Sequence, residues 1–274
     1  MNKIIKNSTL KKTKPKFVQG LELSPFMSEE NVPVIEKETS LGKLKFWGFG
    51  ATSEFRVRTL LTKEPETIEW INSFDKNSLF WDIGANIGCY SLYASLKAKK
   101  VIAFEPSAFN YFLLNKNIHL NQVNSKVESY NIAFSDENGL DSFYLSSEES
   151  AGAENSFGIK EDAYGNKMEV AYRQTCIGWS IDDFISQYKL PIPNYIKIDV
   201  DGIEPLIIKG AAKTFMNRGL KSVLIEVNEF KTDEISFICS FMKKNSFNKV
   251  TKRHAPDFDD SYYKPFFNYI FFRD

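Results

Sequence analysis

LFWDIGANIGCYS, the stretch from residue 79 to residue 91, predicts a buried strand, a glycine turn and the start of a helix. An apolar run at Val101–Phe104 follows as a second strand and ends at Glu105. Ser107 is a typical N-cap for the next helix, which is expected to end near Asn121. The order strand, helix, strand, helix indicates an α/β fold built on a parallel sheet.

The rest of the chain continues this alternation, with one interruption. Further elements are expected as a strand at 127–132, a helix at 181–188 after Ser180, a strand at 195–200, a helix at 205–216, a strand at 222–227, a helix at 235–244 and an edge or hairpin strand at 266–272. In between, Asn138-Gly139 predicts a hairpin that joins Phe134 to Phe143. Residues 146–166 lack a period and predict a mobile surface loop, which either folds over a substrate or is an inert insertion.

Residues 1–75 are predicted to form an N-terminal extension packed against a core domain at 76–274. Apolar residues between Leu44 and Val57, among them Phe55, are spaced as in short strands rather than as in a helix. Residues 65–73 predict a short helix that leads into the first strand of the core.

The composition is that of an ordinary globular protein, because 274 residues carry 35 Lys+Arg against 35 Asp+Glu. A formal net charge of zero argues against a nucleic-acid binder with a broad cationic surface. Six lysines between residues 3 and 16 indicate a solvated tail, with contact to phosphate or an anionic membrane as the alternative. No transmembrane segment or secretory signal is recognisable, so a cytoplasmic protein is expected.

Cysteine and histidine are too scarce for several common kinds of site. Three widely spaced cysteines, at 89, 176 and 239, predict neither a disulfide framework nor a zinc site, and favour a reducing compartment. His119 and His254 are the only histidines, so any metal would be held mainly by oxygen. His254 is a weak candidate for a general base.

The turn from Gly84 to Gly88 suits a nucleotide-type ligand, because glycines permit positive φ and close approach of a ligand to a helix N-terminus. Glu105 ends the next strand, where a carboxylate accepts hydrogen bonds from both hydroxyls of a ribose. A dinucleotide site would ordinarily read G-x-G-x-x-G, which this turn does not. The carboxylate of Asp82 suits a cationic amino-acid portion better than a pyrophosphate. S-adenosylmethionine is therefore the expected cofactor, with a nicotinamide dinucleotide as the alternative.

A second group of polar residues follows later strands. Lys197 and Asp199 share one face of a buried strand, and its carboxyl end lies where ligands bind in such sheets. Glu226 and Asn228 end the next strand. Asp199 or Glu226 is the expected general base, or the two with Asn228 hold a Mg²⁺ that lowers the pKa of an acceptor hydroxyl. Lys197 either pairs with a carboxylate or contacts the substrate, and Asp201 is expected to cap the following helix.

Several ordered motifs resemble the FkbM-type methyltransferases. They are WDIGANIGCYS at 81–91, AFEPS at 103–107, YIKIDVDGIE at 195–204 and LIEVN at 224–228, with a similar lead-in, TKEPETIEW, at 62–70. The resemblance implies a class I, Rossmann-like methyltransferase with a mostly parallel seven-stranded sheet flanked by helices. It also implies transfer of a methyl group from S-adenosylmethionine to a hydroxyl of a sugar, glycan or natural product.

The resemblance assigns cofactor-binding roles to Asp82, Gly84, Asn86, Gly88 and Glu105, and adenine contacts to Asn131 and Ala133. We therefore expect an enzyme that methylates a small-molecule or glycan acceptor and binds no nucleic acid. The alternatives are a nicotinamide-dependent oxidoreductase and a non-catalytic binding module on the same fold. The identity of the acceptor and the oligomeric state do not follow from the sequence.

Overall fold

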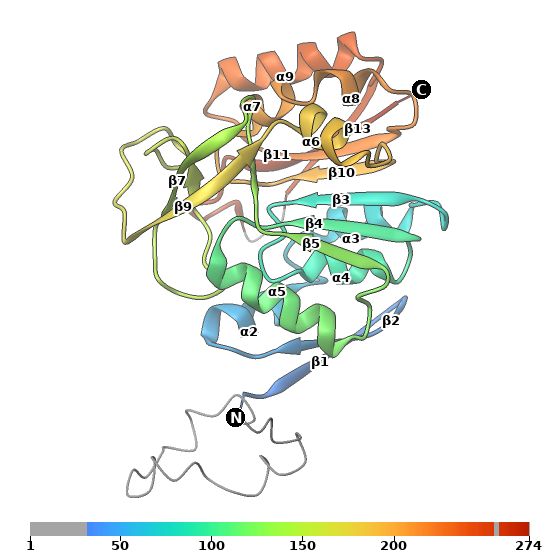
Figure 1. Ribbon diagram of the computed structural model, residues 1–274, viewed down its shortest axis with the longest axis vertical. Coiled ribbons are helices and arrows are strands. Elements are labelled where there is room, and N and C mark those ends of the chain that lie inside the picture. The colour runs from blue at the N-terminus through green and yellow to red at the C-terminus, as the bar shows by residue number, and fades with distance from the viewer. Residues whose placement is uncertain (1–31, 255–257, 274) are drawn as a thin grey trace, which may run out of the picture. The chain divides into compact units, whose positions relative to one another are not determined.

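The computed structural model describes residues 32–254 and 258–273 (Figure 1). The predicted lysine-rich tail lies outside this described part. The helices are α2 (Ala51–Thr59), α3 (Pro65–Asn72), α4 (Cys89–Ser95), α5 (Ala108–Leu120), α6 (Ile181–Tyr188), α7 (Glu204–Lys209), α8 (Ala212–Met216) and α9 (Thr232–Lys244). The strands are β1 (Val34–Thr39), β2 (Gly42–Trp47), β3 (Leu79–Ile83), β4 (Lys100–Phe104), β5 (Val127–Tyr130), β6 (Ala133–Phe134), β7 (Gly139–Leu145), β8 (Ser156–Phe157), β9 (Tyr172–Trp179), β10 (Tyr195–Ile198), β11 (Ser222–Asn228), β12 (Lys249–Arg253) and β13 (Phe266–Phe272).

A seven-stranded sheet forms the centre of the fold, with the strand order β12-β13-β11-β10-β3-β4-β5. Strands β11, β10, β3, β4 and β5 run parallel, whereas β13 is antiparallel to both of its neighbours. The predicted mostly parallel sheet of seven strands is confirmed. The last strand, β13, pairs with β12 as a hairpin strand and is not at the edge, because the polar strand β12 covers it.

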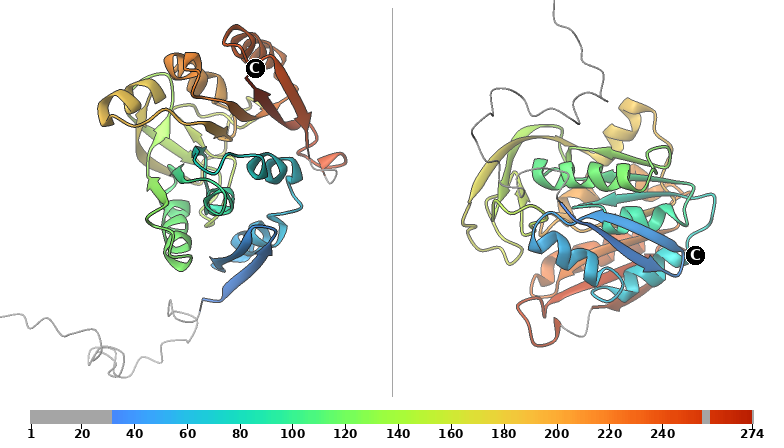
Figure 2. Two further views of the ribbon diagram at one scale, coloured as in Figure 1. Left: turned by 90° about the vertical axis from the view of Figure 1, so that its right-hand side faces the viewer. Right: turned by 90° about the horizontal axis from the view of Figure 1, so that it is seen from below.

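Helices cover both faces of this sheet, with α6 to α9 on one face and α3 to α5 on the other (Figures 1 and 2). Neighbouring residues of β3 pack in opposite directions. Phe80 contacts Trp70 of α3 with ring centroids 5.8 Å apart, whereas Trp81 contacts Phe184 of α6 at 6.3 Å. Successive side chains of a strand point to opposite faces, so an apolar run is what a sheet covered on both faces requires.

The helix predicted at 205–216 is divided into α7 and α8 at Gly210. A Cβ atom at Gly210 would lie 2.2 Å from the backbone oxygen of Ser135, so the chain passes too close for any side chain. The carboxylate of Asp182, in α6, then accepts hydrogen bonds from the backbone N–H groups of Lys213 and Thr214 at 2.7 and 2.8 Å. A neighbouring helix thus caps the start of α8.

A smaller four-stranded sheet, with the order β6-β9-β7-β8, is attached to the large one. The hairpin predicted at Asn138-Gly139 is wrong, because β9 lies between β6 and β7 and pairs with both. The Asn138 side chain accepts a hydrogen bond from the N–H of Ser180 at 2.7 Å and donates one to Asp183 at 2.8 Å. The turn residue therefore holds the start of α6 rather than a two-strand hairpin.

The segment at 146–166, predicted as a surface loop, is in fact built into the protein. It contains β8, and Ala151 and Asn155 are buried. Asn110 of α5 fixes it by accepting a hydrogen bond from the N–H of Ala151 at 2.8 Å and donating one to the carbonyl of Gly152 at 3.1 Å. The composition of the segment could not reveal this, because the groups that hold it come from elsewhere in the chain.

A hairpin and two helices precede the large sheet. β1 and β2 pair antiparallel, and β2 lies beside α5, where Asn117 accepts a hydrogen bond from the N–H of Trp47 at 2.7 Å (Figure 2). Phe55 and Val57 were expected in short strands. This prediction is wrong, because both residues lie in α2. Ser53 and Val57, four residues apart, form its buried side while Phe55 is exposed. The expected helix at 65–73 is confirmed as α3, and the domain boundary at residue 75 stays a prediction.

In the described part of the chain, no helix is long and apolar enough to cross a membrane.

Candidate active site

A cavity of about 590 Å³ lies where the central strands end. Gly84 follows β3, Glu105 follows β4, Asp199 follows β10, and Glu226 lies near the end of β11, and all four line it. The remaining wall comes from α2, the loop before α3, the segment at 147–155 and residues near the start of β13. Ligands of open α/β sheets bind outside the carboxyl ends of the strands, so this cavity is the expected place for a cofactor and its substrate.

Glu105 and the glycine turn form one hydrogen-bonded unit. The two carboxylate oxygens of Glu105 accept hydrogen bonds from the N–H of Ser107 at 2.8 Å and from the N–H of Asn86 at 2.7 Å. Burial raises the pKa of Glu105 to about 7, although these two hydrogen bonds oppose the shift. Each carboxylate oxygen can accept a second hydrogen bond, so Glu105 is still able to receive ribose hydroxyls.

The other cofactor candidates do not line the large cavity. Asp82 is buried beneath the turn, where its Oδ2 accepts a hydrogen bond from Ser91 at 2.5 Å and its Oδ1 has no partner within the described residues. Gly88 is buried against Leu114 of α5.

Asn131 directly follows β5, and Ala133 is the first residue of β6 in the small sheet. The Asn131 side chain donates hydrogen bonds to the carbonyls of Glu105 and Pro106, at 2.8 and 2.9 Å, and thus supports the segment that carries Glu105. Ala133 is buried and lines a small hollow that it shares with Gly84. Their predicted contact with adenine stays a prediction.

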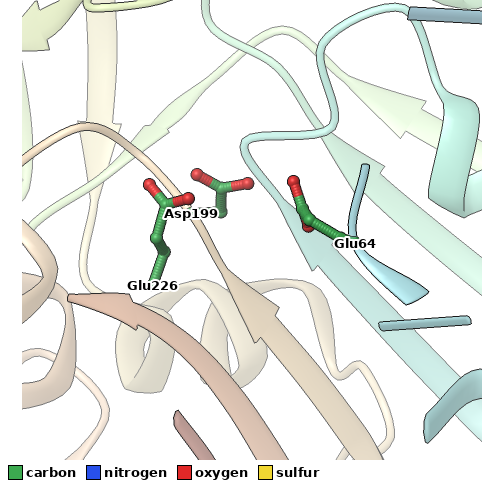
Figure 3. Close-up of side chains that lie close together, drawn as sticks. All are labelled: Glu64, Asp199 and Glu226. Atoms are coloured by element: carbon green, nitrogen blue, oxygen red, sulfur yellow. The ribbon is translucent and has the colours of Figure 1, made fainter. Parts of the chain in front are cut away.

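Three carboxyl groups lie close together, from Glu64, Asp199 and Glu226, and the last two line the cavity (Figure 3). One oxygen of each lies within 4.8 Å of one oxygen of the other two. Asp199 and Glu226 were predicted to share a crevice, and the fold brings them together. Glu64 is the N-cap residue of the lead-in helix α3, whereas Trp70, later in α3, contacts Tyr195 at the start of β10.

Lys197 lies directly below this cluster and is 1% exposed. Its Nζ lies 2.5 Å from Oδ2 of Asp199 and 5.1 Å from the ring centre of Tyr90. Although burial favours the neutral form of Asp199, the ammonium group holds the pKa of its carboxyl below the ordinary value. Of the two roles left open for Lys197, the ion pair is the one present.

Glu226 has the opposite electrostatic character. Burial raises the pKa of Glu226 well above its ordinary value, and the nearby carboxylates of Asp199 and Glu64 raise it further. Two acids of one cluster therefore differ: the pKa of Asp199 is lowered, whereas the pKa of Glu226 is raised. Such a pair of carboxyl groups with opposed pKa shifts is typical of acid–base sites.

The cluster does not fit Mg²⁺ well. Glu64 already faces Lys63, whose Nζ lies 3.2 Å from Oε1, and Asp199 faces Lys197. A divalent cation would have to compete with two ammonium groups for the same oxygens. Asn228, the third predicted ligand, is outside the cluster, because its side chain donates to the carbonyl of Ala163 and accepts from the N–H of Phe230.

Asp201 does not cap α7, contrary to expectation. Its Oδ2 accepts hydrogen bonds from the backbone N–H groups of Glu154 and Asn155, at 2.8 and 3.4 Å. Burial, together with the charge of Asp199, raises the pKa of Asp201 to about 6. Asp201 thus anchors the segment that closes one side of the cavity.

Among the residues that sequence reasoning missed, Arg56 and Lys63 line the cavity and Glu64 belongs to the carboxyl cluster. Lys63 and Glu64 belong to the lead-in motif at 62–70, which was noted for its resemblance but given no chemical role. That motif was the available signal. No comparable signal in the sequence pointed to Arg56, because the region of α2 was expected to form strands.

The sequence matches the family described as Methyltransferase FkbM domain over residues 82–249. Because the match spans more than half of the chain, the chain belongs to the FkbM methyltransferase family. The predicted resemblance and the expected class of enzyme are confirmed. The alternative of a nicotinamide-dependent oxidoreductase has no support from this family membership.

Two individual proteins are similar to this chain. Hexuronic acid methyltransferase AglP of Haloferax volcanii is 25% identical over 174 residues, which are 64% of this chain and 66% of that protein. The crystal structure of methyltransferase FkbM from Methylobacillus flagellatus KT superposes with a TM-score of 0.54 and 16% sequence identity, over 81% of this chain and 53% of that one. The chain thus spans just under two thirds of the first protein and about half of the second. The structural likeness shows the class I methyltransferase fold.

Methyltransferases of this family use S-adenosylmethionine, and the donor chemistry of the cavity fits it. Glu105 has free acceptor capacity for the ribose. The ionised Asp199 suits the cationic part of the cofactor.

Proposed function

We propose that this protein is an S-adenosylmethionine-dependent O-methyltransferase that acts on a hydroxyl of a carbohydrate or glycan. The observation that carries the proposal is Glu226, a carboxyl group with a raised pKa that lines the cavity beside the ionised Asp199. A hydroxyl acceptor must lose its proton during methyl transfer, whereas a carboxylate acceptor has none to lose. A general base in the cavity therefore favours a hydroxyl acceptor.

Glu226 is the better of the two predicted bases. The raised pKa of Glu226 makes its carboxylate, once ionised, the stronger of the two bases. Asp199 is paired with Lys197 and has a lowered pKa, so its carboxylate is a weak base. Asp199 attracts the cationic part of the cofactor. Glu226 is then the group that takes the proton of the acceptor hydroxyl.

The remaining catalytic contribution is positioning. S-adenosylmethionine supplies a methyl group that is already activated by its sulfonium. The chain has to hold the acceptor oxygen in line with that group, and such orientation can supply several kcal/mol, up to about 7–11 kcal/mol in well-oriented systems. Glu105 and Asn86 would fix the cofactor at one end, while Glu226 would orient the acceptor hydroxyl at the other.

Two observations support a sugar as the acceptor. The name of the similar AglP describes a hexuronic acid methyltransferase, which suggests a sugar-derived substrate here. Phe55, Phe258 and Tyr263 line the same cavity, and aromatic rings supply flat apolar faces beside polar groups. A cytoplasmic location belongs to the same proposal and rests on the scarce, unpaired cysteines.

The decisive variant is Glu226→Gln, which keeps the shape of the side chain and removes its basicity. We expect kcat for methyl transfer from labelled S-adenosylmethionine to a glycan panel to fall by about 10²–10⁴-fold. The Kd for S-adenosylhomocysteine should change less than about threefold, because a base acts on the acceptor and not on the cofactor.

Glu137→Gln, on the exposed loop before β7, is the matched control and should behave as the wild type. The labelled methyl should also survive mild alkali, because an ether resists the hydrolysis that cleaves an ester. Unchanged turnover in Glu226→Gln, or an alkali-labile product, would contradict the proposal. Cofactor binding without transfer to any acceptor would support a non-catalytic binding module instead.

A further inference from the structure

Two cationic side chains line the cavity and take no part in the methyl transfer outlined above. Arg56 comes from α2 and Lys63 from the loop before α3. The Nε of Arg56 donates to the carbonyl of Ala151 at 2.7 Å. In residues 32–254 and 258–273, no carboxylate lies within ion-pair distance of Arg56, so most of its donors remain available at the cavity.

Lys63 stands close to the reacting end of the cavity. Its Nζ lies 3.2 Å from Oε1 of Glu64 and 5.7 Å from the ring centre of Phe258. Although burial favours its neutral form, the carboxylates of Glu64 and Glu226 raise the pKa of Lys63, which keeps it charged. Lys63 lines the same cavity as Asp199 and Glu226, and its charge opposes the effect of burial on the pKa values of both carboxyl groups.

Arg56 and Lys63 line the same cavity, and the charge of Arg56 opposes the raised pKa of Lys63. Two cations that line one cavity, one of them without a carboxylate partner among the described residues, favour an anionic ligand there. Arg presents a planar fork of donors that matches a carboxylate, and Lys adds a point charge. Both line the cavity with three aromatic side chains, Phe55, Phe258 and Tyr263.

We propose that Arg56 and Lys63 form a carboxylate-binding subsite that selects an acidic sugar, of the uronic-acid type, as the acceptor. This inference rests on the proposed function and adds the charge of the substrate. The carboxylate of the sugar is bound by the two cations, its apolar ring face lies on the aromatic side chains, and one of its hydroxyls reaches Glu226. The acid group anchors the acceptor and is not itself methylated.

The test compares acidic and neutral sugars on the full chain saturated with S-adenosylhomocysteine. Methyl glucuronide is paired with methyl glucoside and methyl galacturonide with methyl galactoside, and each is titrated by calorimetry. In at least one pair, the acid is expected to bind at least tenfold more tightly than its neutral partner. Arg56→Gln and Lys63→Gln should each reduce this preference to less than about threefold, and Arg56→Lys should retain part of it.

Arg58→Gln is the matched control, because Arg58 lies on the same helix but is exposed and pairs with Glu54. It should keep the full preference for the acid. Thermal unfolding of every variant establishes that it is folded. If no acid binds better than its neutral partner in the wild type, or if the preference survives in Arg56→Gln and Lys63→Gln, the inference is overturned.

The amino-acid carboxylate of the cofactor is the competing occupant, and a second titration separates the two. S-adenosylhomocysteine carries that carboxylate, whereas 5′-methylthioadenosine lacks it. If Arg56→Gln and Lys63→Gln weaken the first at least tenfold but not the second, the subsite serves the cofactor and the acceptor assignment is wrong. Methyl transfer to neutral sugars alone would overturn this inference while leaving the proposed function intact. A wild type that binds no S-adenosylhomocysteine would overturn both.

Discussion

Glu204 is a buried acid whose surroundings favour the protonated form. Its Oε1 accepts hydrogen bonds from the backbone N–H groups of Val200 and Gly202, at 3.3 and 3.2 Å, and the residue is 6% exposed. Burial raises its pKa to about 7, against an ordinary value of 4.5. Hydrogen bonds from neutral amides stabilise the carboxylate, but less than water does.

The raised pKa of Glu204 makes stability depend on pH in a definite direction. The folded state keeps this proton between pH 4.5 and about 7 while the unfolded state loses it, so the contribution to stability falls as pH rises through that window. Glu204→Gln cannot ionise and should therefore be more stable than the wild type at pH 8, by up to roughly 3 kcal/mol. The difference should vanish near pH 4.

Urea denaturation of both proteins at pH 4, 6 and 8 measures this effect. Glu137→Gln, which removes an exposed carboxylate, should show no such trend. A stability difference that is the same at all three pH values would show that the raised pKa of Glu204 is not its cause.

At the scale of elements, the turn between β3 and α4 is fitted to the end of β10. Gly84 has φ of 84°, and a Cβ atom there would lie 1.8 Å from the backbone oxygen of Asp199. The sequence predicted a glycine for the approach of a ligand. The structure gives an additional reason: a side chain at Gly84 would collide with the backbone of Asp199, directly after β10.

Gly84→Ala should therefore disturb two elements at once. A positive φ and an overlap with a neighbouring backbone each cost on the order of 1–3 kcal/mol, so we expect a loss of about 2–4 kcal/mol in unfolding free energy. Affinity for S-adenosylhomocysteine should fall as well, because Asp199 has to move. Gly139→Ala is the control, since a Cβ there meets nothing within 4 Å. Equal unfolding free energies for the two variants would contradict this account.

For the molecule as a whole, the sequence predicts the elements that have local signals. It does not predict features that depend on contacts between segments far apart in the chain. The strand at 79–83 and the helix capped by Ser107 were predictable because their apolar pattern and N-cap are local signals. The strand β12 was missed because, as a polar edge strand, it has no apolar pattern. The prediction of a hairpin at Asn138 was wrong because β7 pairs with β9, which lies about 40 residues away in sequence.

The candidate site follows the same rule. Asp199 and Glu226 were predictable, because both lie at the carboxyl ends of neighbouring parallel strands. Glu64 was not, because its burial depends on β13, where Asn268 donates to Glu64 at 3.4 Å and to Glu66 at 2.8 Å. These partners are about 200 residues apart in sequence, and only the completed sheet brings them together.

Closure of the cavity is a property of the whole molecule, because the segment at 149–155 is held by five separate parts of the chain. Its partners are Thr52, Arg56, Asn86, Asn110, Asp201 and Tyr263. Among these partners, Asn110 is buried, with an exposed fraction of 2%, and it forms two hydrogen bonds with the segment. Losing it leaves the N–H of Ala151 without its partner at a cost of about 1–3 kcal/mol, while Asn86 still binds Gly152.

Asn110→Ala should therefore loosen the segment without unfolding the protein. Amide hydrogen exchange at 149–155 should accelerate by about 5- to 150-fold, which is what about 1–3 kcal/mol of lost local stability implies. The affinity for S-adenosylhomocysteine should fall in step, because an open segment leaves Glu105 and Asn86 exposed to water. Asn115→Ala is the matched control: Asn115 lies on the same helix but bonds Tyr111 and Ser129, away from the cavity. If exchange at 149–155 is the same in both variants, the hydrogen bonds from Asn110 do not hold the segment closed, and closure must depend on the contacts from α2 and Asp201.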